Sequence, residues 1–202
     1  MKLEEEGDML VGTHKILFIT NNDHKVNEAN RILSPLGIEM IKLNFTKIEI
    51  QSNSLRKIAK YASIYAANKI LKPIVVEDSG LFIKSLNGFP GPFSSYVYNK
   101  LGCKGILKLM NGINDRTAIF KCVVSYCQPG YKPIIFEGIT YGEISLEIRG
   151  SSGFGFDPIF IPKSGNGLTF SEMLPEEKDR FSHRGKAFRK FGEWYINNIA
   201  KP

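Results

Sequence analysis

The sequence predicts an α/β protein built on a mixed β-sheet. In the first half of the chain, short apolar segments alternate with segments whose apolar residues recur at helical spacing, a pattern typical of βαβ units. In the second half, two long strand-like segments flank Gln128-Pro129-Gly130, which predicts an antiparallel hairpin. At 202 residues, the chain suits one domain with a sizeable core.

The first half contains three expected strands and two expected helices. Each strand is a short apolar run that stops at a turn signal, and each helix has apolar residues three and four positions apart. Asn22 or Asp23 is suited to cap the first helix, and Pro73 to end the second. In chain order we expect a strand at 15–20, a helix at 23–33, a strand at 38–44, a helix at 55–71 and a strand at 74–77.

Ser79-Gly80 is a turn signal directly after the third strand, so we expect the chain to break there. The last helix is expected to begin near Ser182, because the apolar residues beyond it recur on one helical face. Between these points we expect a strand at 81–85, a Pro/Gly-rich loop, a short helix at 101–110 and long strands at 117–127 and 133–148.

The net charge of +7 favours an acidic partner, either nucleic acid or a small molecule that carries four negative charges. The basic residues are scattered, without a block or an arginine-rich arm, so we expect most of them on the solvated surface. No segment approaches the roughly 20 apolar residues of a membrane helix. The first residues are acidic where a signal peptide would be basic and then apolar. We therefore expect a loose extension at residues 1–14 and a cytoplasmic location.

The three cysteines are odd in number and lack C-x-x-C spacing, so the sequence predicts neither a disulfide framework nor a zinc site. Cys122 and Cys127 stand five positions apart in an expected strand and should point to opposite faces of the sheet. All three, with Cys103, are expected to be small buried residues.

Residues 74–93 are the most informative stretch of the chain. Three β-branched residues lead into Glu77 and Asp78. Burying two carboxylates at the end of a strand is unfavourable unless positive charge lies nearby. A divalent metal that carries phosphates would supply that charge. An aspartate that caps a turn is the simpler interpretation of these residues taken alone.

Residues 20–25 lie where the first strand gives way to the first helix. The free backbone N–H groups of a helix start attract phosphate, and Lys25 adds a positive charge one turn in. Helix capping by Asn22 or Asp23 explains the same residues without a ligand. Neither the P-loop pattern nor G-x-G-x-x-G occurs anywhere in the chain.

Two segments near the C-terminus have the composition of a base pocket. In residues 153–157, glycines allow close backbone approach, Phe154 offers a stacking face and Asp157 a polar edge. A glycine-rich turn with two core aromatic residues is the alternative. Ser182-His183-Arg184 stands at a helix start, where a core rarely holds a His-Arg pair. Such donors suit a 6-oxo purine, whose O6 accepts hydrogen bonds, and would oppose the amino group of adenine.

Four segments, in this order, resemble the inosine triphosphate pyrophosphatase family. Residues 20–25 resemble its T-x-N-x-x-K motif, with Glu28 three positions further on, and residues 74–93 resemble its acidic signature. Residues 153–158 (GFGFDP) resemble its G-F-G-[aromatic]-D-P loop, and residues 177–187 (EKDRFSHRGKA) its E-K-x-x-x-S-H-R-G-K-A segment. The resemblance runs from about Lys15 to the C-terminal helix.

The resemblance implies a hydrolase that converts ITP, dITP and XTP to the monophosphate and pyrophosphate. Asp78 would bind Mg²⁺ and orient or deprotonate the attacking water. Glu49, in Ile48-Glu49-Ile50-Gln51, would be the second metal ligand, with Glu77 as the alternative. The residues implied to bind substrate are Thr20, Asn21, Asn22, Asp23, His24, Lys25, Ser79, Phe154, Gly155, Phe156, Asp157, Lys178, Ser182, His183 and Arg184.

At two positions the chain departs from the family pattern. Ala62 stands where many relatives have a lysine, and Tyr96 where many have an arginine. The phosphate contacts of those two side chains are therefore not expected here.

The resemblance also implies an elongated mixed sheet flanked by helices, with two lobes, the active-site cleft between them, and a homodimer. Residues 15–202 would form this pyrophosphatase domain. We expect a nucleotide substrate, and neither a membrane nor a stably bound nucleic acid. Three alternatives stay open: a pyrophosphatase for modified pyrimidine nucleotides, a nucleotide sensor without turnover, and a nucleic-acid-binding protein that uses the +7 charge.

Overall fold

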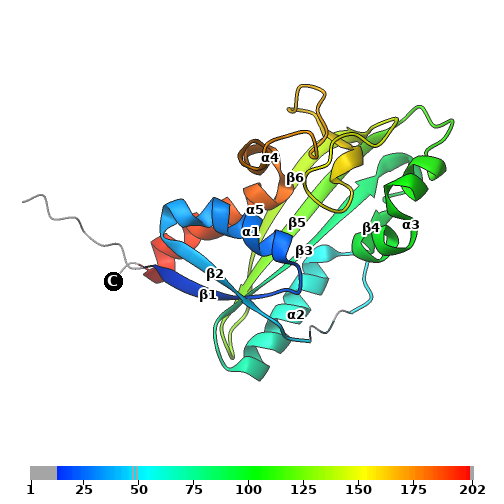
Figure 1. The fold of residues 1–202 in the computed structure, drawn as a ribbon. Helices are drawn as coiled ribbons and strands as arrows, with labels where there is room; N and C mark the ends of the chain where they lie inside the picture. Colours follow the sequence, from blue (N-terminus) through cyan, green and yellow to red (C-terminus); the bar gives the residue numbers. More distant parts are fainter. Residues whose placement is uncertain (1–12, 47, 49, 201–202) are drawn as a thin grey trace, which may run out of the picture.

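The computed structural model describes residues 13–200, apart from 47 and 49, and has a seven-stranded mixed sheet at its centre (Figure 1). The strand order is β2-β1-β3-β5-β6-β7, and β4 pairs with β3. The strands are β1 (His14–Ile19), β2 (Ile38–Leu43), β3 (Ile74–Ile83), β4 (Pro90–Gly91), β5 (Thr117–Cys127), β6 (Ile134–Ile144) and β7 (Phe160–Pro162). The helices are α1 (Asp23–Leu33), α2 (Leu55–Ile70), α3 (Ser94–Leu109), α4 (Pro175–Phe181) and α5 (His183–Tyr195).

The pairing confirms the predicted mixture of parallel and antiparallel strands. β1 lies parallel to β2 and to the start of β3, as expected for βαβ units. β5 and β6 form the predicted hairpin, and β3, β5, β6 and β7 run antiparallel in turn. On the edge of β3 opposite β5, β1 pairs only as far as Val76 and β4 pairs only at Leu81 and Phe82, so residues 77–80 pair with neither strand.

The predicted break at Ser79-Gly80 is wrong, since β3 continues through both residues to Ile83. Gly80 pairs with Lys121 of β5, and a Cβ built on it would lie 2.2 Å from the carbonyl oxygen of Gly91 in β4. The glycine therefore serves the close approach of a neighbouring strand, which is the second common reason for a glycine in a strand. The sequence alone does not separate this role from a turn.

Two helices also differ from the prediction. α3 begins at Ser94, seven residues before the expected start, and Gly102 (φ 61°) interrupts it. α4, at Pro175–Phe181, was not predicted, because seven residues are too few to show a helical period. The predicted bounds of α1 and β5 are confirmed, and α5 begins directly after its cap Ser182.

The apolar core is divided along the long central strands, which confirms the expected two-lobed sheet. One cluster lies where α1 and α5 cover the sheet, and it includes Phe18, Cys122 and Phe188. A second lies at the other end of β3 and β5, where α3 and β7 pack, and it includes Leu81 and Phe160. α2 covers the opposite face of the sheet (Figure 1).

Cys122 and Cys127 belong to different clusters, on the two faces of the sheet, as the strand spacing predicted. With Cys103, they are buried and free. In the described part of the chain, no helix combines the length and the apolar character needed to cross a membrane.

The start of α5 is held directly against the sheet by a glycine of β6. A Cβ built on Gly138 would lie 1.9 Å from the carbonyl oxygen of His183 and 2.7 Å from the nitrogen of Ala187. Any side chain at this position would therefore push α5 outwards. This contact fixes the height of His183 and Arg184 above the sheet.

Candidate active site

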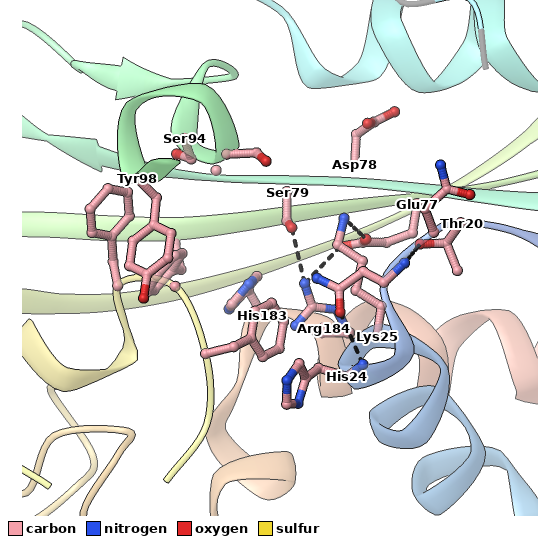
Figure 2. A pocket seen from close by; sticks show the side chains of 18 of the residues that line it. Thr20, His24, Lys25, Glu77, Asp78, Ser79, Ser94, Tyr98, His183 and Arg184 are labelled. Carbon is pink, nitrogen blue, oxygen red and sulfur yellow. Dashed lines mark hydrogen bonds and ion pairs between the residues drawn. The ribbon is translucent and has the colours of Figure 1, made fainter. Parts of the chain in front are cut away.

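A pocket of about 970 Å³ lies between the two lobes and collects the segments singled out in the sequence (Figure 2). It is lined by the loop after β1 with the first turn of α1, by the middle of β3, by the first turns of α3, by the loop before β7 and by the start of α5. In residue numbers, these are mainly 19–25, 77–80, 92–99, 153–157 and 183–184. Segments more than a hundred residues apart thus meet in one cavity.

The loop after β1 presents the N-terminus of α1 to this pocket. Asn22 caps the helix, because its Oδ1 accepts a hydrogen bond from the backbone N–H of His24 at 2.9 Å. The Oγ1 of Thr20 accepts from the N–H of Asn22 at 3.1 Å and stiffens the turn. Asn22, rather than Asp23, is therefore the cap, while Asp23 pairs with Lys42 at 2.6 Å. The arrangement suits an anion at the helix start.

Glu77 is buried and holds two cations at the pocket wall. Its Oε2 lies 2.6 Å from the Nζ of Lys25, and its Oε1 lies 3.1 Å from Nη2 of Arg184. Burial raises the pKa of Glu77, but Arg184 and Lys25 lower it further, so this pKa lies well below its usual range. A carboxylate that faces two cations is poorly placed to ligate a metal, which weighs against the alternative role considered for Glu77.

The Glu77 cluster is one end of a longer chain of buried charges. The Nζ of Lys178 lies 2.6 Å from a carboxylate oxygen of Glu28 and 2.6 Å from one of Asp157. Nη1 of Arg184 lies 2.6 Å from the other oxygen of Glu28. The alternating chain reads Asp157, Lys178, Glu28, Arg184, Glu77 and Lys25. It links the loop before β7 to the start of α1.

Glu28 is the central member of this chain, and it lies behind the pocket wall. Burial raises the pKa of Glu28, but Arg184 and Lys178 lower it further, to about 2. The pKa of Lys178 is raised, because the Asp157 and Glu28 carboxylates outweigh the opposing effect of its burial. Pairing of this quality is what allows so many charges to be buried. Sequence reasoning placed Glu28 in a motif but gave it no role.

Asp78 points to the other side of β3 from Glu77, Ser79 and Arg184 (Figure 2). Successive side chains of a strand alternate between the two faces, so neighbouring carboxylates meet different surroundings. The Oγ of Ser79 accepts a hydrogen bond from Nη2 of Arg184 at 3.0 Å. Asp78 lines the pocket and is largely buried, with 9% of the residue exposed.

The surroundings of Asp78 are compatible with a magnesium ion. Mg²⁺ takes one or two protein carboxylates and completes its shell with waters and substrate phosphates, so it needs no cluster of protein ligands. Residues 13–200, apart from 47 and 49, hold no group of three or more metal-ligating side chains. A carboxylate that lines the same pocket as an anion-binding helix start fits a metal that arrives with phosphate. Glu49, predicted as the second ligand, lies outside the described residues.

The loop before β7 is shaped by Asp157 and supported by α3. The backbone N–H of Phe154 donates to Oδ2 of Asp157 at 2.8 Å, and this carboxylate lies so close to Gly153 (φ +77°) that a Cβ there would clash. The ring of Phe156 packs edge-on against Tyr98 of α3, with centroids 5.4 Å apart. Asp157 thus faces the loop and Lys178, while the ring of Phe154 is partly exposed in the pocket.

The start of α5 contributes a neutral histidine and a buried arginine. The ring of His183 stacks on Phe120, with centroids 4.5 Å apart and planes 7° from parallel. Burial and the positive charge of Arg184 hold the pKa of His183 well below its usual range, so the imidazole is neutral at pH 7. Within the described residues, Nδ1 of His183 and Nε of Arg184 are buried without a hydrogen-bond partner.

Of the predicted substrate-binding residues, all but two line the pocket. Ser182 is fully buried and caps α5 by accepting from the N–H of Gly185 at 2.9 Å, and Lys178 lies in the charge chain. Both support the wall from behind. Among the lining residues that the sequence did not single out are Tyr98 of α3 and Phe120 of β5. Their only sequence signal is an apolar position in a helix or a strand, which says nothing about a pocket.

The fold and the pocket define an α/β protein with an anion-binding helix start, a carboxylate and an aromatic loop around one cleft. The chain belongs to the Ham1 family, whose sequence profile matches residues 16–194. This agrees with the resemblance drawn from the four segments.

Similar proteins cover nearly the whole chain. It is 50% identical over 186 residues to the dITP/XTP pyrophosphatase of Methanopyrus kandleri, covering 92% of this chain and 98% of that protein. It is 49% identical over 185 residues to the dITP/XTP pyrophosphatase of Pyrococcus horikoshii, with coverage of 92% and 98%. The solved structure of a HAM1 protein from Coxiella burnetii superposes with a TM-score of 0.79 at 31% identity, covering 91% of this chain and 99% of that one.

Proposed function

We propose that this protein hydrolyses non-standard purine nucleoside triphosphates, namely ITP, dITP and XTP, to the monophosphate and pyrophosphate. The observation that carries the proposal is the meeting of Lys25, Asp78 and the Phe154–Asp157 loop in one pocket. The names of the relatives at 50% and 49% identity support the same substrate class. The nucleotide would lie with its phosphates at α1 and its base at the loop before β7.

The phosphate end of the proposed site is the start of α1. Its free backbone N–H groups and Lys25 would hold the triphosphate, with Lys25 turning from Glu77 to the ligand. Thr20 and Asn22 fix the turn that presents these groups. Ser79 supplies a hydroxyl on the same face of β3 as Arg184.

Asp78 is the proposed catalytic residue. Its carboxylate would orient a water molecule and accept its proton while the water oxygen bonds to the α-phosphorus. The bond from that phosphorus to the oxygen bridging the α- and β-phosphates breaks, and pyrophosphate departs with the electron pair. Magnesium, bound by Asp78 and phosphate oxygens, would neutralise charge on the phosphates. Glu49 is the proposed second ligand.

The base end combines a stacking face with hydrogen-bond donors. Phe154 offers its ring, and His183 and Arg184 lie beside it as potential donors to the O6 of a 6-oxo purine. Adenine carries an amino group at that position, so ATP would meet donor with donor. In the same proposal the enzyme works in the cytoplasm as a homodimer and holds no nucleic acid stably.

Product analysis tests the proposal. Wild-type protein incubated with ITP and magnesium should yield IMP and pyrophosphate in equal amounts, and EDTA should stop the reaction. Release of IDP and orthophosphate would place cleavage at the wrong phosphorus. Tight DNA binding with a steep salt dependence and no turnover would instead favour the nucleic-acid-binding alternative.

A further inference from the structure

The imidazole of His24 lies flat on the ring of Phe154 in the pocket. The ring centroids are 5.1 Å apart and the planes are 17° from parallel. His24 is in the first turn of α1 and points into the cavity below Arg184 (Figure 2). The N-terminus of α1 forms the phosphate end of the pocket, and through His24 it therefore also contacts the loop at the base end of the pocket.

Phe154 is the fixed partner in this contact. Its backbone N–H is bonded to Asp157, and the buried cations of Lys178 and Arg184 lie 5.1 Å and 5.2 Å from its ring centroid. Both cations are held in place by Glu28. His24, in contrast, is an exposed side chain on a helix surface, so it is the partner that can turn.

The present spacing leaves no room for a base between the two rings. Flat rings in contact lie about 3.5 Å apart, so two walls with a base between them need about 7 Å. Because 5.1 Å joins the ring centroids, the imidazole must move away from Phe154 by at least about 2 Å, a displacement that rotation of an exposed side chain supplies without moving α1. A base that stacks on Phe154 must therefore either take His24 as its second wall or displace it.

We propose that His24 is the second wall of the base site, and that the purine base inserts between His24 and Phe154. The inference rests on the proposed function and adds a residue to its base end. Adjacent residues of one helical turn would then act on opposite ends of the nucleotide, Lys25 on the phosphates and His24 on the base. Stacking on both faces exchanges one ring contact in the free protein for two in the complex.

Calorimetric binding of two probes in magnesium-containing buffer tests this division. IMP carries the base, and inorganic tripolyphosphate carries only the phosphates. The variants are His24→Ala, His24→Phe and His24→Lys, with Lys25→Ala as the contrasting change at the phosphate end. His14→Ala is the matched control, because His14 also contacts an aromatic ring, that of Tyr195, away from the pocket.

His24→Ala should weaken IMP binding about fivefold, a modest factor because the variant also loses the His24 contact with Phe154 in the free protein. Tripolyphosphate binding should change by less than about twofold, since stacking involves no phosphate. His24→Phe should restore IMP binding, and His24→Lys should not. Lys25→Ala should weaken tripolyphosphate binding more than IMP binding. His14→Ala should bind both probes like the wild type.

Tighter IMP binding by His24→Ala would overturn the inference, because His24 would then be a placeholder that the base must displace. Equal weakening of both probes would overturn it in favour of a phosphate contact, and unchanged binding of both would also overturn it. Wild-type turnover of ITP distinguishes a failure of the inference about His24 from a failure of the proposed function. If the wild type releases pyrophosphate and binds IMP, a negative result at His24 leaves the proposed function standing; if it does neither, both fall.

Discussion

Glu77 and Asp78 show how two adjacent carboxylates acquire different roles from the pleat of a strand. Glu77 faces α1 and α5, where Lys25 and Arg184 neutralise it. Asp78 faces the other way, at the pocket edge (Figure 2). The sequence pair E-D predicts a cation nearby but not which carboxylate meets a protein cation. Strand alternation settles that once the partners of one face are known.

This difference gives a paired prediction. Asp78→Asn should lower the turnover of ITP by about 10²–10⁴-fold with little change in the midpoint of thermal unfolding, because it removes a general base that lines the pocket but keeps the size and shape of the side chain. Glu77→Gln, in contrast, should lower the free energy of unfolding. It leaves Lys25 and Arg184 without their shared counter-charge, and loss of one partner of a buried pair destabilises by about 3 kcal/mol or more.

Steady-state kinetics and urea unfolding of the two variants, side by side, provide the measurement. A wild-type rate in Asp78→Asn at saturating ITP and magnesium would contradict the catalytic assignment. An unfolding free energy unchanged in Glu77→Gln would show that the two cations find other partners.

At the scale of elements, the position of α5 depends on a residue of another element. The apolar face of α5 predicts that it packs on the sheet, and Ser182 predicts where it begins. Only the contact of Gly138 with the backbone of His183 and Ala187 sets how closely it packs. This contact therefore sets the positions of His183 and Arg184 at the start of α5.

Gly138→Ala should therefore shift the first turn of α5 away from β6. A methyl group 1.9 Å from the His183 oxygen cannot be accommodated without backbone movement, which costs about 1–3 kcal/mol in a packed interior. We expect a lower midpoint of thermal unfolding together with weaker ITP turnover. Gly130→Ala in the hairpin turn is the control for destabilisation away from α5: a Cβ there meets nothing within 4 Å, but φ is +79°, so alanine strains the backbone without displacing a neighbour. Equal effects of the two changes on turnover would contradict the role given to Gly138.

β3 illustrates where the sequence prediction failed at this scale. A glycine after a serine indicates a turn when only neighbours along the chain are considered. In the fold, the same glycine lies against Gly91 of β4, and the strand continues. α3 was likewise predicted too short, because the residues before Gly102 face the pocket, and their apolar pattern is broken by Ser94, Ser95 and Asn99.

At the scale of the whole molecule, the buried charge chain connects the two ends of the pocket and both C-terminal helices to α1. Its members come from α1, β3, the loop before β7, α4 and α5. The chain holds equal numbers of cations and carboxylates, so protonating a carboxylate leaves a buried cation uncompensated. The free energy of unfolding should consequently fall as the pH is lowered.

The sign follows from Glu28 and Glu77, whose pKa values are lowered, whereas burial raises the pKa of the third carboxylate, Asp157, which opposes this trend. Glu28 has a folded-state pKa of about 2 against an ordinary value of 4.5, so its contribution is present above about pH 4.5 and is lost as the pH falls towards 2. A shift of this size corresponds to roughly 3 kcal/mol. The pKa of Glu77 is also lowered, so Glu77 contributes in the same direction.

Urea unfolding between pH 7 and pH 2.5 measures this dependence. The unfolding free energy of the wild type should fall with pH more steeply than that of Glu28→Gln, so that the two proteins converge at the acid end. Parallel pH dependences of the unfolding free energy in the two proteins would mean that Glu28 does not have the lowered pKa described here.

The sequence by itself determined the α/β class, the family, the bounds of α1 and β5 and most of the residues gathered in the pocket. These properties depend on local information, namely apolar periodicity, capping residues and short motifs, which a linear chain carries in full. Only the tertiary structure decided that Lys178 and Ser182 support the wall from behind, that Glu77 pairs with cations while Asp78 faces the pocket edge, and that His24 lies on Phe154. Each of these depends on the direction of a side chain towards a residue far away in sequence, and spacing along the chain contains no record of that direction.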